Sequence, residues 1–356
     1  MTKNRFFTYI IIFSVFISSI CGCSASTASN STPAQEAESF DGKDYIEESS
    51  LTSAGEDIEA AVADYTPINN YDSELSVPTY ITKVDDTWFI VDCYHNRVIY
   101  SKELGAPLNN WLIMSSEATQ PHTMASDGTV YLIDDTENNR VLVYEKKDDK
   151  FIYTQRFNDI GHRPHYTVYD KATDTFYVWS SVTGELFCFR RDASTDRVYL
   201  TDKRVISSLD GIYVRSFSII DGDIYFVSGV SDSQPDAKIL RCDLETLDIK
   251  EEYPVPDEIA GMVQLTKIDK GFLVTVSTDK SGDQSKATIV ETPSLKDLSK
   301  GKYTDIYSDY FIGGGTPYYI SNVDDTYFLT EHRIKEHSIW SFKAAGKNIT
   351  DVNSLY

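Results

Sequence analysis

The sequence predicts an all-β protein whose main domain is a six-bladed β-propeller. Residues 86–100 and 127–144 are near copies of each other, in which two β-rich runs are joined by a polar turn containing Asp, Asn and Arg. Weaker copies of this pattern continue to the end of the chain, and no long segment has helical periodicity. A repeat of about 40 residues built from short β-rich runs is typical of propeller blades.

Six repeats are expected because six β-rich runs of one kind recur at similar intervals. We assign each of these runs to the second strand of a blade. The two copied stretches contain the runs of the first and second blades. A two-sheet sandwich is the alternative fold, but it does not require six similar units at one period. The outer strand of the last blade is left open, with residues 349–356 and 69–77 as the two candidates. The six runs are anchored at Trp88, Val130, Phe176, Ile224, Phe272 and Tyr327.

The first 22 residues have the pattern of an export signal. Lys3 and Arg5 precede an apolar run over residues 6–20, which is shorter than the roughly 20 residues needed to span a bilayer. The sequence Ile20-Cys21-Gly22-Cys23 resembles the bacterial lipobox, which implies lipidation of Cys23 and cleavage before it. An ordinary signal peptide or an uncleaved anchor is the alternative. We expect a protein that is lipid-anchored to the cell membrane and faces the extracytoplasmic side.

Residues 23–65 are expected to form a flexible tether, and residues 66–356 the propeller. The tether is rich in Ser, Thr, Ala, Asp and Glu, and such a composition cannot bury enough apolar surface to fold by itself. The whole chain has a formal net charge of −22, which argues against nucleic acid as a partner because that ligand requires a basic surface. Composition and charge do not indicate an oligomeric state.

The two copied stretches are similar to NHL repeats. The residues that carry the resemblance are Asp127-Gly128, Val130-Tyr131-Leu132 and Asn138-Asn139-Arg140-Val141, together with Phe89–Asp92 and His95–Val98 in the first copy. The resemblance implies an NHL/TolB-like six-bladed propeller. It implies no single function, because such propellers include extracellular lyases, peptide-amidating lyases and binding scaffolds. The Asp, Asn and Arg of the turn are expected to brace the blade.

The first strand of each blade lines the central channel of a propeller, so equivalent residues of these strands meet at one channel mouth. Aligning the repeats places Tyr80, His122, His165, Ser216, Gln264 and Tyr319 at equivalent positions. Pro-His occurs at this position in two successive repeats. Sites that collect one side chain from each blade form polar and aromatic pockets. The predicted ligand-binding residues are therefore Tyr80, His122, His165, Arg215, Gln264, Tyr318 and Tyr319.

Three functions are compatible with this ring of residues. The first is binding of a small molecule, glycan or peptide, with tyrosines stacking on the ligand and His, Arg and Gln forming hydrogen bonds. The second is a lyase or hydrolase in which a channel histidine acts as a general base. The third is a protein-binding scaffold of the cell envelope, which would use the blade faces rather than this ring. No cofactor is expected, and no metal either, because no third ligand accompanies His122 and His165. The triplet Glu331-His332-Arg333 is interpreted as a solvated loop between strands, with a position at the channel mouth as the alternative.

Overall fold

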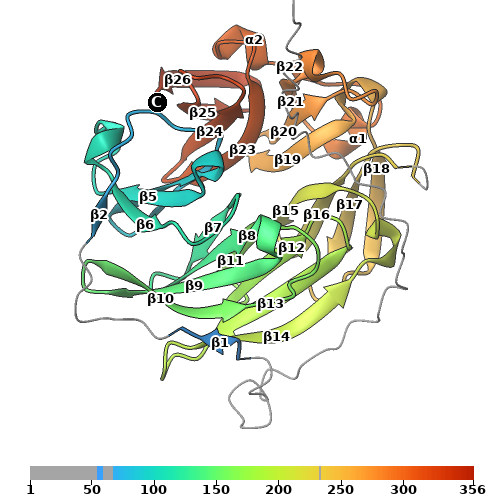
Figure 1. Ribbon diagram of the computed structural model, residues 1–356. Coiled ribbons are helices and arrows are strands. Elements are labelled where there is room, and N and C mark those ends of the chain that lie inside the picture. Colours follow the sequence, from blue (N-terminus) through green and yellow to red (C-terminus); the bar gives the residue numbers. More distant parts are fainter. Residues whose placement is uncertain (1–53, 59–66, 232–233) are drawn as a thin grey trace, which may run out of the picture. The chain divides into compact units, whose positions relative to one another are not determined.

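Six antiparallel sheets arranged as the blades of a propeller make up the described part of the protein (Figure 1). The computed structural model describes residues 54–58, 67–231 and 234–356. Neighbouring blades contact each other mainly through their first strands, and blade six returns to blade one. The predicted fold is therefore confirmed. The signal sequence, Cys23 and most of the predicted tether lie outside the described residues.

The first three blades follow the chain from the inner to the outer strand. Blade one contains β3 (Pro78–Val84), β4 (Thr87–Asp92), β5 (Arg97–Ser101), β6 (Leu112–Ser115) and the added β2 (Ile68–Asn69). Blade two contains β7 (Met124–Ser126), β8 (Val130–Asp135), β9 (Arg140–Lys147), β10 (Lys150–Phe157) and the added β1 (Glu56–Asp57). Blade three contains β11 (Pro164–Asp170), β12 (Thr175–Ser180), β13 (Glu185–Arg191) and β14 (Val198–Val205).

The last three blades repeat the same strand order. Blade four contains β15 (Val214–Ile220), β16 (Asp223–Ser228), β17 (Lys238–Asp243) and β18 (Ile249–Pro254). Blade five contains β19 (Gly261–Ile268), β20 (Gly271–Thr278), β21 (Thr288–Thr292) and β22 (Thr304–Asp305). Blade six contains β23 (Thr316–Val323), β24 (Thr326–His332), β25 (Ile339–Ala345) and β26 (Asn348–Ser354).

Short helical turns connect these strands. Two of them are α-helical, α1 (Leu295–Leu298) and α2 (Tyr307–Tyr310). The others are 3₁₀ turns, of which two follow the second strands of blades one and two. These turns are η4 (Cys93–His95), η5 (Leu108–Asn110), η6 (Thr136–Asn138), η7 (Ser207–Leu209), η8 (Asp257–Ile259) and η9 (Gln284–Lys286).

Each predicted anchor lies in the second strand of its blade, from Trp88 in β4 to Tyr327 in β24. These strands are buried because both faces of an inner strand pack against neighbouring blades. Trp179 of blade three, for example, lies with its ring centroid 4.4 Å from that of Phe226 in blade four. Apolar and aromatic side chains thus fill the space between blades, which is the main source of stability in such a fold.

The ring closes without exchanging a strand between its first and last blades. Residues 348–354 form β26, the outer strand of blade six, whereas β2 joins β6 of blade one, so the first of the two predicted candidates is correct. Blade six lies beside blade one in Figure 1. The Oγ of Ser321 donates to the carbonyl of Ile81 (2.5 Å), and the hydroxyl of Tyr356 donates to the carbonyl of Ala106 (3.1 Å). Polar contacts of this kind close the seam.

One part of the predicted tether belongs to the propeller. Glu56 and Asp57 form β1 and pair with β10 at the outer edge of blade two. Ala54 is buried, and its carbonyl accepts a hydrogen bond from the amide of Gln155 (2.7 Å). The composition of residues 23–65 did not reveal this strand, because edge pairing depends on backbone hydrogen bonds supplied by blade two.

None of the helices among the described residues is long and apolar enough to cross a membrane.

Candidate functional site

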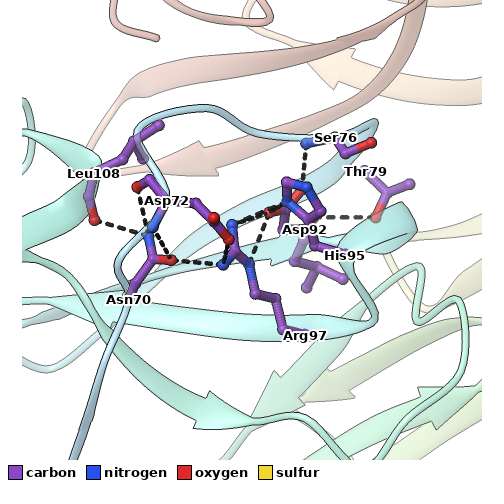
Figure 2. A network of polar contacts seen from close by, with 9 residues as sticks. Asn70, Asp72, Ser76, Thr79, Asp92, His95, Arg97 and Leu108 are labelled. Atoms are coloured by element: carbon purple, nitrogen blue, oxygen red, sulfur yellow. Dashed lines mark hydrogen bonds and ion pairs between the residues drawn. The ribbon is translucent and has the colours of Figure 1, made fainter.

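The Asp-Arg turns of blades one and two brace their blades, as the sequence predicts. Asp92 is fully buried, and its Oδ2 accepts hydrogen bonds from Nε (2.9 Å) and Nη2 (2.7 Å) of Arg97 (Figure 2). Its Oδ1 accepts from the backbone N–H of Ser76 (2.7 Å), just before the first strand. Asp135 and Arg140 form the equivalent pair in blade two. Each carboxylate thereby fixes the start of its own blade.

The Asn side chain of each turn reaches the next blade. Oδ1 of Asn96 accepts from the backbone N–H of Gln120 (2.9 Å), and Oδ1 of Asn139 accepts from that of Arg163 (2.8 Å). Gln120 and Arg163 directly precede the two Pro-His pairs and have φ angles of 50° and 60°. Few residues other than glycine adopt positive φ, so these hydrogen bonds hold an unfavourable backbone conformation. The turns of blades one and two therefore position the histidines of blades two and three.

Replacing Asn139 tests this coupling. Asn139 itself has a φ of 53°, so Asn139→Ala loses the hydrogen bond and also strains the turn, whereas Asn139→Gly loses mainly the hydrogen bond. We expect Asn139→Ala to lower the free energy of unfolding by about 1–2 kcal/mol and Asn139→Gly to lower it less. Urea denaturation measures both. If both variants lost the same free energy of unfolding, strain in the left-handed conformation of residue 139 would not contribute to the destabilisation.

Two histidines and two tyrosines form a buried cluster at the edge of the ring where the first strands begin. The rings of His122 and His165 are stacked with centroids 3.8 Å apart. Nδ1 of His165 lies 2.8 Å from the hydroxyl of Tyr319, and its Nε2 lies 3.3 Å from that of Tyr318. Blades two, three and six thus contribute to one polar cluster, which we call the inner layer (His122, His165, Tyr318 and Tyr319).

β-Bulges near the start of the first strands contain several of the predicted site residues. His165 lies in a bulge of β11, between the paired residues Pro164 and Tyr166, and Arg215 and Tyr318 lie in the corresponding bulges of β15 and β23. The carbonyl of Arg215 lies 3.1 Å from Nδ1 of His165. An extra residue in a bulge changes the register of all that follow.

Tyr80 and Gln264 do not join the inner layer. Both are the first residue after a bulge, equivalent to Tyr166 rather than to His165. Nε2 of Gln264 donates to the hydroxyl of Tyr166 (2.7 Å), and its Oε1 accepts from the backbone of Ile320 (2.6 Å). Tyr80 packs against the hydrophobic core that includes Tyr166. The predicted alignment is wrong by one residue, because these two residues and Tyr319 correspond to the position after the bulge, whereas His165 lies within it. The bulges cannot be read from the repeat.

Burial keeps the two inner histidines neutral. It lowers the pKa of His122 to about 3, with a further contribution from the charge of Arg163. Burial also holds the pKa of His165 far below its ordinary value, and the neighbouring His122 adds to this effect. Nδ1 of His122 lies 2.9 Å from the hydroxyl of Thr136. The inner layer is therefore a rigid, hydrogen-bonded platform without net charge.

A buried carboxylate of blade two supports this platform. Asp134 accepts hydrogen bonds from the backbone N–H of His122 (2.6 Å) and from the N–H (2.9 Å) and hydroxyl (2.5 Å) of Thr123. Burial raises the pKa of Asp134 to about 7. Asp134 thus fixes the backbone on which His122 is mounted.

A second, more accessible set of side chains surrounds the inner layer at the same edge. The hydroxyl of Tyr213 lies 2.9 Å from Nε2 of His165, and the guanidinium of Arg215 lies over the Tyr213 ring at 4.8 Å. The ring of His332 stacks on Tyr318 with centroids 3.8 Å apart. Arg333 and Tyr94 are exposed, and Tyr94 is close enough to influence the pKa of Arg333. We call this set the outer layer: Tyr94, Tyr213, Arg215, His332 and Arg333.

Of the outer layer, only Arg215 is among the predicted site residues. The triplet Glu331-His332-Arg333 is noticeable in the sequence. Its interpretation as a solvated loop is wrong for Glu331, which is buried in β24, and for His332, which stacks on Tyr318. Tyr213 precedes Arg215 by two residues, the spacing that puts two strand residues on one face. Tyr94 lies in η4, a 3₁₀ turn that directly follows the second strand of its blade, as η6 does in blade two. The described residues of blades three to six contain no 3₁₀ turn in this position.

No group of three or more His, Cys, Asp or Glu side chains among the described residues is placed to hold a metal ion. The three cysteines described, Cys93, Cys188 and Cys242, are buried thiols. The donors of the two layers are imidazoles, phenols and guanidiniums, which suit hydrogen bonding to an organic ligand.

No family model matches the sequence, and no curated protein matches it either. Solved structures do match. Hydrazine synthase from Kuenenia stuttgartiensis is 14% identical with a TM-score of 0.52, and the match covers 78% of this chain and 80% of that chain. A streptogramin B lyase is 14% identical with a TM-score of 0.51, and the match covers 80% of this chain and 85% of that chain. Saccharomyces cerevisiae Sqt1 is 9% identical with a TM-score of 0.52, and the match covers 81% of this chain and 87% of that chain. Likeness at such low identity shows the fold alone, and that fold is a β-propeller.

Proposed function

We propose that this protein is an extracytoplasmic lipoprotein, anchored through Cys23, whose propeller binds a small molecule, glycan or peptide at one edge of the ring. The observation that carries the proposal is the outer layer, where Tyr213, Arg215 and His332 come together from blades four and six. These accessible polar and aromatic side chains lie on the rigid, neutral inner layer. Ligand sites combine aromatic surface with a few fixed polar groups in this way.

The same geometry gives less support to a lyase or hydrolase. A general base works best when its pKa is near the operating pH, whereas burial lowers the pKa of His122 to about 3. Both nitrogens of His165 already lie within hydrogen-bonding distance of protein groups, the hydroxyls of Tyr213 and Tyr319. The buried histidines are therefore suited to positioning the tyrosines rather than to accepting a proton from a substrate.

A glycan and peptide array probed with the full-length protein in detergent tests the binding function. We expect at least one ligand to bind the wild type, and Tyr213→Ala to bind it about tenfold or more weakly, since stacking and a hydrogen bond are both lost. Tyr71→Ala is the matched control because Tyr71 is 81% exposed and is not part of either layer. Absence of any ligand, or equal binding by the two variants, would contradict the proposal.

Replacing Cys23 tests the anchor. We expect Cys23→Ala to move the protein from the membrane fraction to the soluble fraction, because two or more acyl chains are needed for stable membrane attachment. Cys21→Ala is the control, since it removes a neighbouring thiol and leaves the lipidated position intact. Immunoblots of fractionated cells measure the distribution. Sedimentation of Cys23→Ala with the membranes would rule out lipidation as the anchor.

A further inference from the structure

We propose that the ligand of the outer layer carries a single oxyanionic group, a carboxylate or a phosphate, which is bound between Arg215 and Arg333. This inference rests on the proposed binding function and specifies the chemistry of its ligand. It follows from how the arginines of this acidic protein are distributed and from the contacts of three outer-layer side chains.

Most arginines of the described residues are neutralised by a carboxylate. Arg333 differs, because it forms none of the ion pairs found among residues 54–58, 67–231 and 234–356. It lies at the end of β24 with a φ of 62°, in a chain with a formal net charge of −22. The arginines paired with Asp or Glu are Arg97, Arg140, Arg156, Arg163, Arg191, Arg197, Arg204 and Arg241.

Arg333 and Arg215 come from blades six and four. A series of contacts links them: Arg215 lies over Tyr213, and Tyr213 and Tyr318 both contact His165. His332, which precedes Arg333, stacks on Tyr318. The like charges of the two arginines repel each other. Burial and the positive charge of Arg215 both lower the pKa of Arg333. The guanidinium of Arg215 is held in place over the Tyr213 ring, and its Nη1 donates to the carbonyl of Met262 (3.3 Å). Two like charges close together destabilise the folded protein, and an anion bound between them is attracted by both and so offsets their repulsion.

His332 supplies a third polar group, and it lies near enough to Arg215 and Arg333 for their charges to lower its pKa. Its Nε2 is buried and has no hydrogen-bond partner among the described residues. Stacking on Tyr318 fixes the plane of the imidazole. Burial holds the pKa of His332 well below its ordinary value, with contributions from His122, Arg333 and Arg215. A neutral imidazole donates one N–H, and buried polar atoms of native proteins nearly always have a partner, so this nitrogen is available to the ligand.

The chemistry of these groups selects the ligand class. Guanidinium groups bind carboxylate and phosphate through paired hydrogen bonds that match the geometry of both anions. The exposed ring of Tyr94 and the half-buried ring of Tyr213 flank the arginines and offer surfaces for an organic body. The positive region is local within a strongly acidic chain, so extended polyanions are repelled and a small ligand with one anionic group is favoured.

The inference is tested by titrating the full-length protein in detergent with sodium phosphate and, separately, with sodium acetate. Sodium chloride keeps the ionic strength constant. We expect calorimetry to detect binding of at least one anion, and the stronger of the two identifies a phosphate or a carboxylate. Arg333→Gln and Arg215→Gln each weaken that binding about tenfold or more, as loss of a charge-assisted hydrogen bond implies. Lys335→Gln removes a charge from the same loop and leaves binding unchanged.

Thermal unfolding without phosphate or acetate supplies a second measurement. We expect Arg333→Gln to raise the unfolding midpoint, because it relieves the repulsion with Arg215, so weaker anion binding by this variant is not the result of misfolding. Equal binding by the wild type and the Arg215→Gln/Arg333→Gln double variant would show an adventitious ion only and would overturn the inference, as would absence of binding. Array ligands that are uncharged and insensitive to phosphate would overturn it while leaving the proposed binding function intact.

Discussion

Arg97→Met is expected to lower the free energy of unfolding by about 3–5 kcal/mol, because it leaves a buried carboxylate without its counter-charge. The side chain of Asp92 is 0% exposed and that of Arg97 only 6%. Nη1 of Arg97 also donates to Oδ1 of Asn70 and to Oδ2 of Asp72, at 2.5 Å in both cases (Figure 2). One guanidinium therefore fastens the turn of blade one and the segment that precedes this blade. Urea denaturation at pH 7 measures the effect.

The matched control is Arg156→Met, the same substitution at a pair that water reaches. The side chains of Arg156 and Glu56 are 27% and 51% exposed, so we expect the free energy of unfolding to stay nearly unchanged. Adding Asp92→Asn to Arg97→Met should recover part of the lost stability, since the buried charge is then removed. Similar losses in Arg97→Met and Arg156→Met would show that burial of Asp92 does not determine the cost.

Glu331→Gln is expected to change how stability depends on pH. Glu331 is 0% exposed, and burial raises its pKa from 4.5 to about 7 although Tyr307 donates a hydrogen bond to Oε2 (2.8 Å). Between these two values the folded protein binds more protons at Glu331 than the unfolded chain does, so stability falls as the pH rises. The loss amounts to about 3 kcal/mol at pH 8. Glutamine does not titrate and avoids it.

The measurement is the difference in unfolding free energy between Glu331→Gln and the wild type at pH 4 and at pH 8. We expect the two proteins to be similar at pH 4 and the variant to be more stable at pH 8. Other titrating groups, Asp134 among them, are present in both proteins and cancel in this difference. Glu336→Gln is the control because Glu336 is exposed. A difference that does not grow with pH would rule out ionisation of Glu331 as the cause.

The blades could be predicted from the sequence because each second strand is buried on both faces and so retains apolar and aromatic residues. Trp88, Phe176 and Tyr327 mark such strands even where the turn motif is absent. The edge strands β1 and β2 could not be predicted. They are two residues long and exposed, and backbone pairing leaves no pattern in so short a segment.

The histidines of the inner layer could be predicted, because the Pro-His pair occurs at the same repeat position in two blades. Tyr80 and Gln264 were misplaced, since a bulge changes the register by one residue without a sequence signal. Most of the outer layer escaped prediction for another reason. Tyr94 lies in the turn η4, His332 is the last residue of β24 and Arg333 follows it, and only packing in three dimensions brings them to one edge of the ring.

The hydrogen bonds of Asn96 and Asn139 bear on how a protein of this kind diverges. In each case the side chain belongs to one blade and the backbone that it holds belongs to the next. The Asn-Arg turn occurs in blades one and two, and the Pro-His pair occurs in blades two and three. The unit that occurs twice in the chain is thus the junction between two blades, in which the Asn of one blade binds the backbone that precedes the Pro-His pair of the next. Transplanting one blade into another propeller would separate its histidine from the residue that positions it, whereas transplanting a junction would carry both.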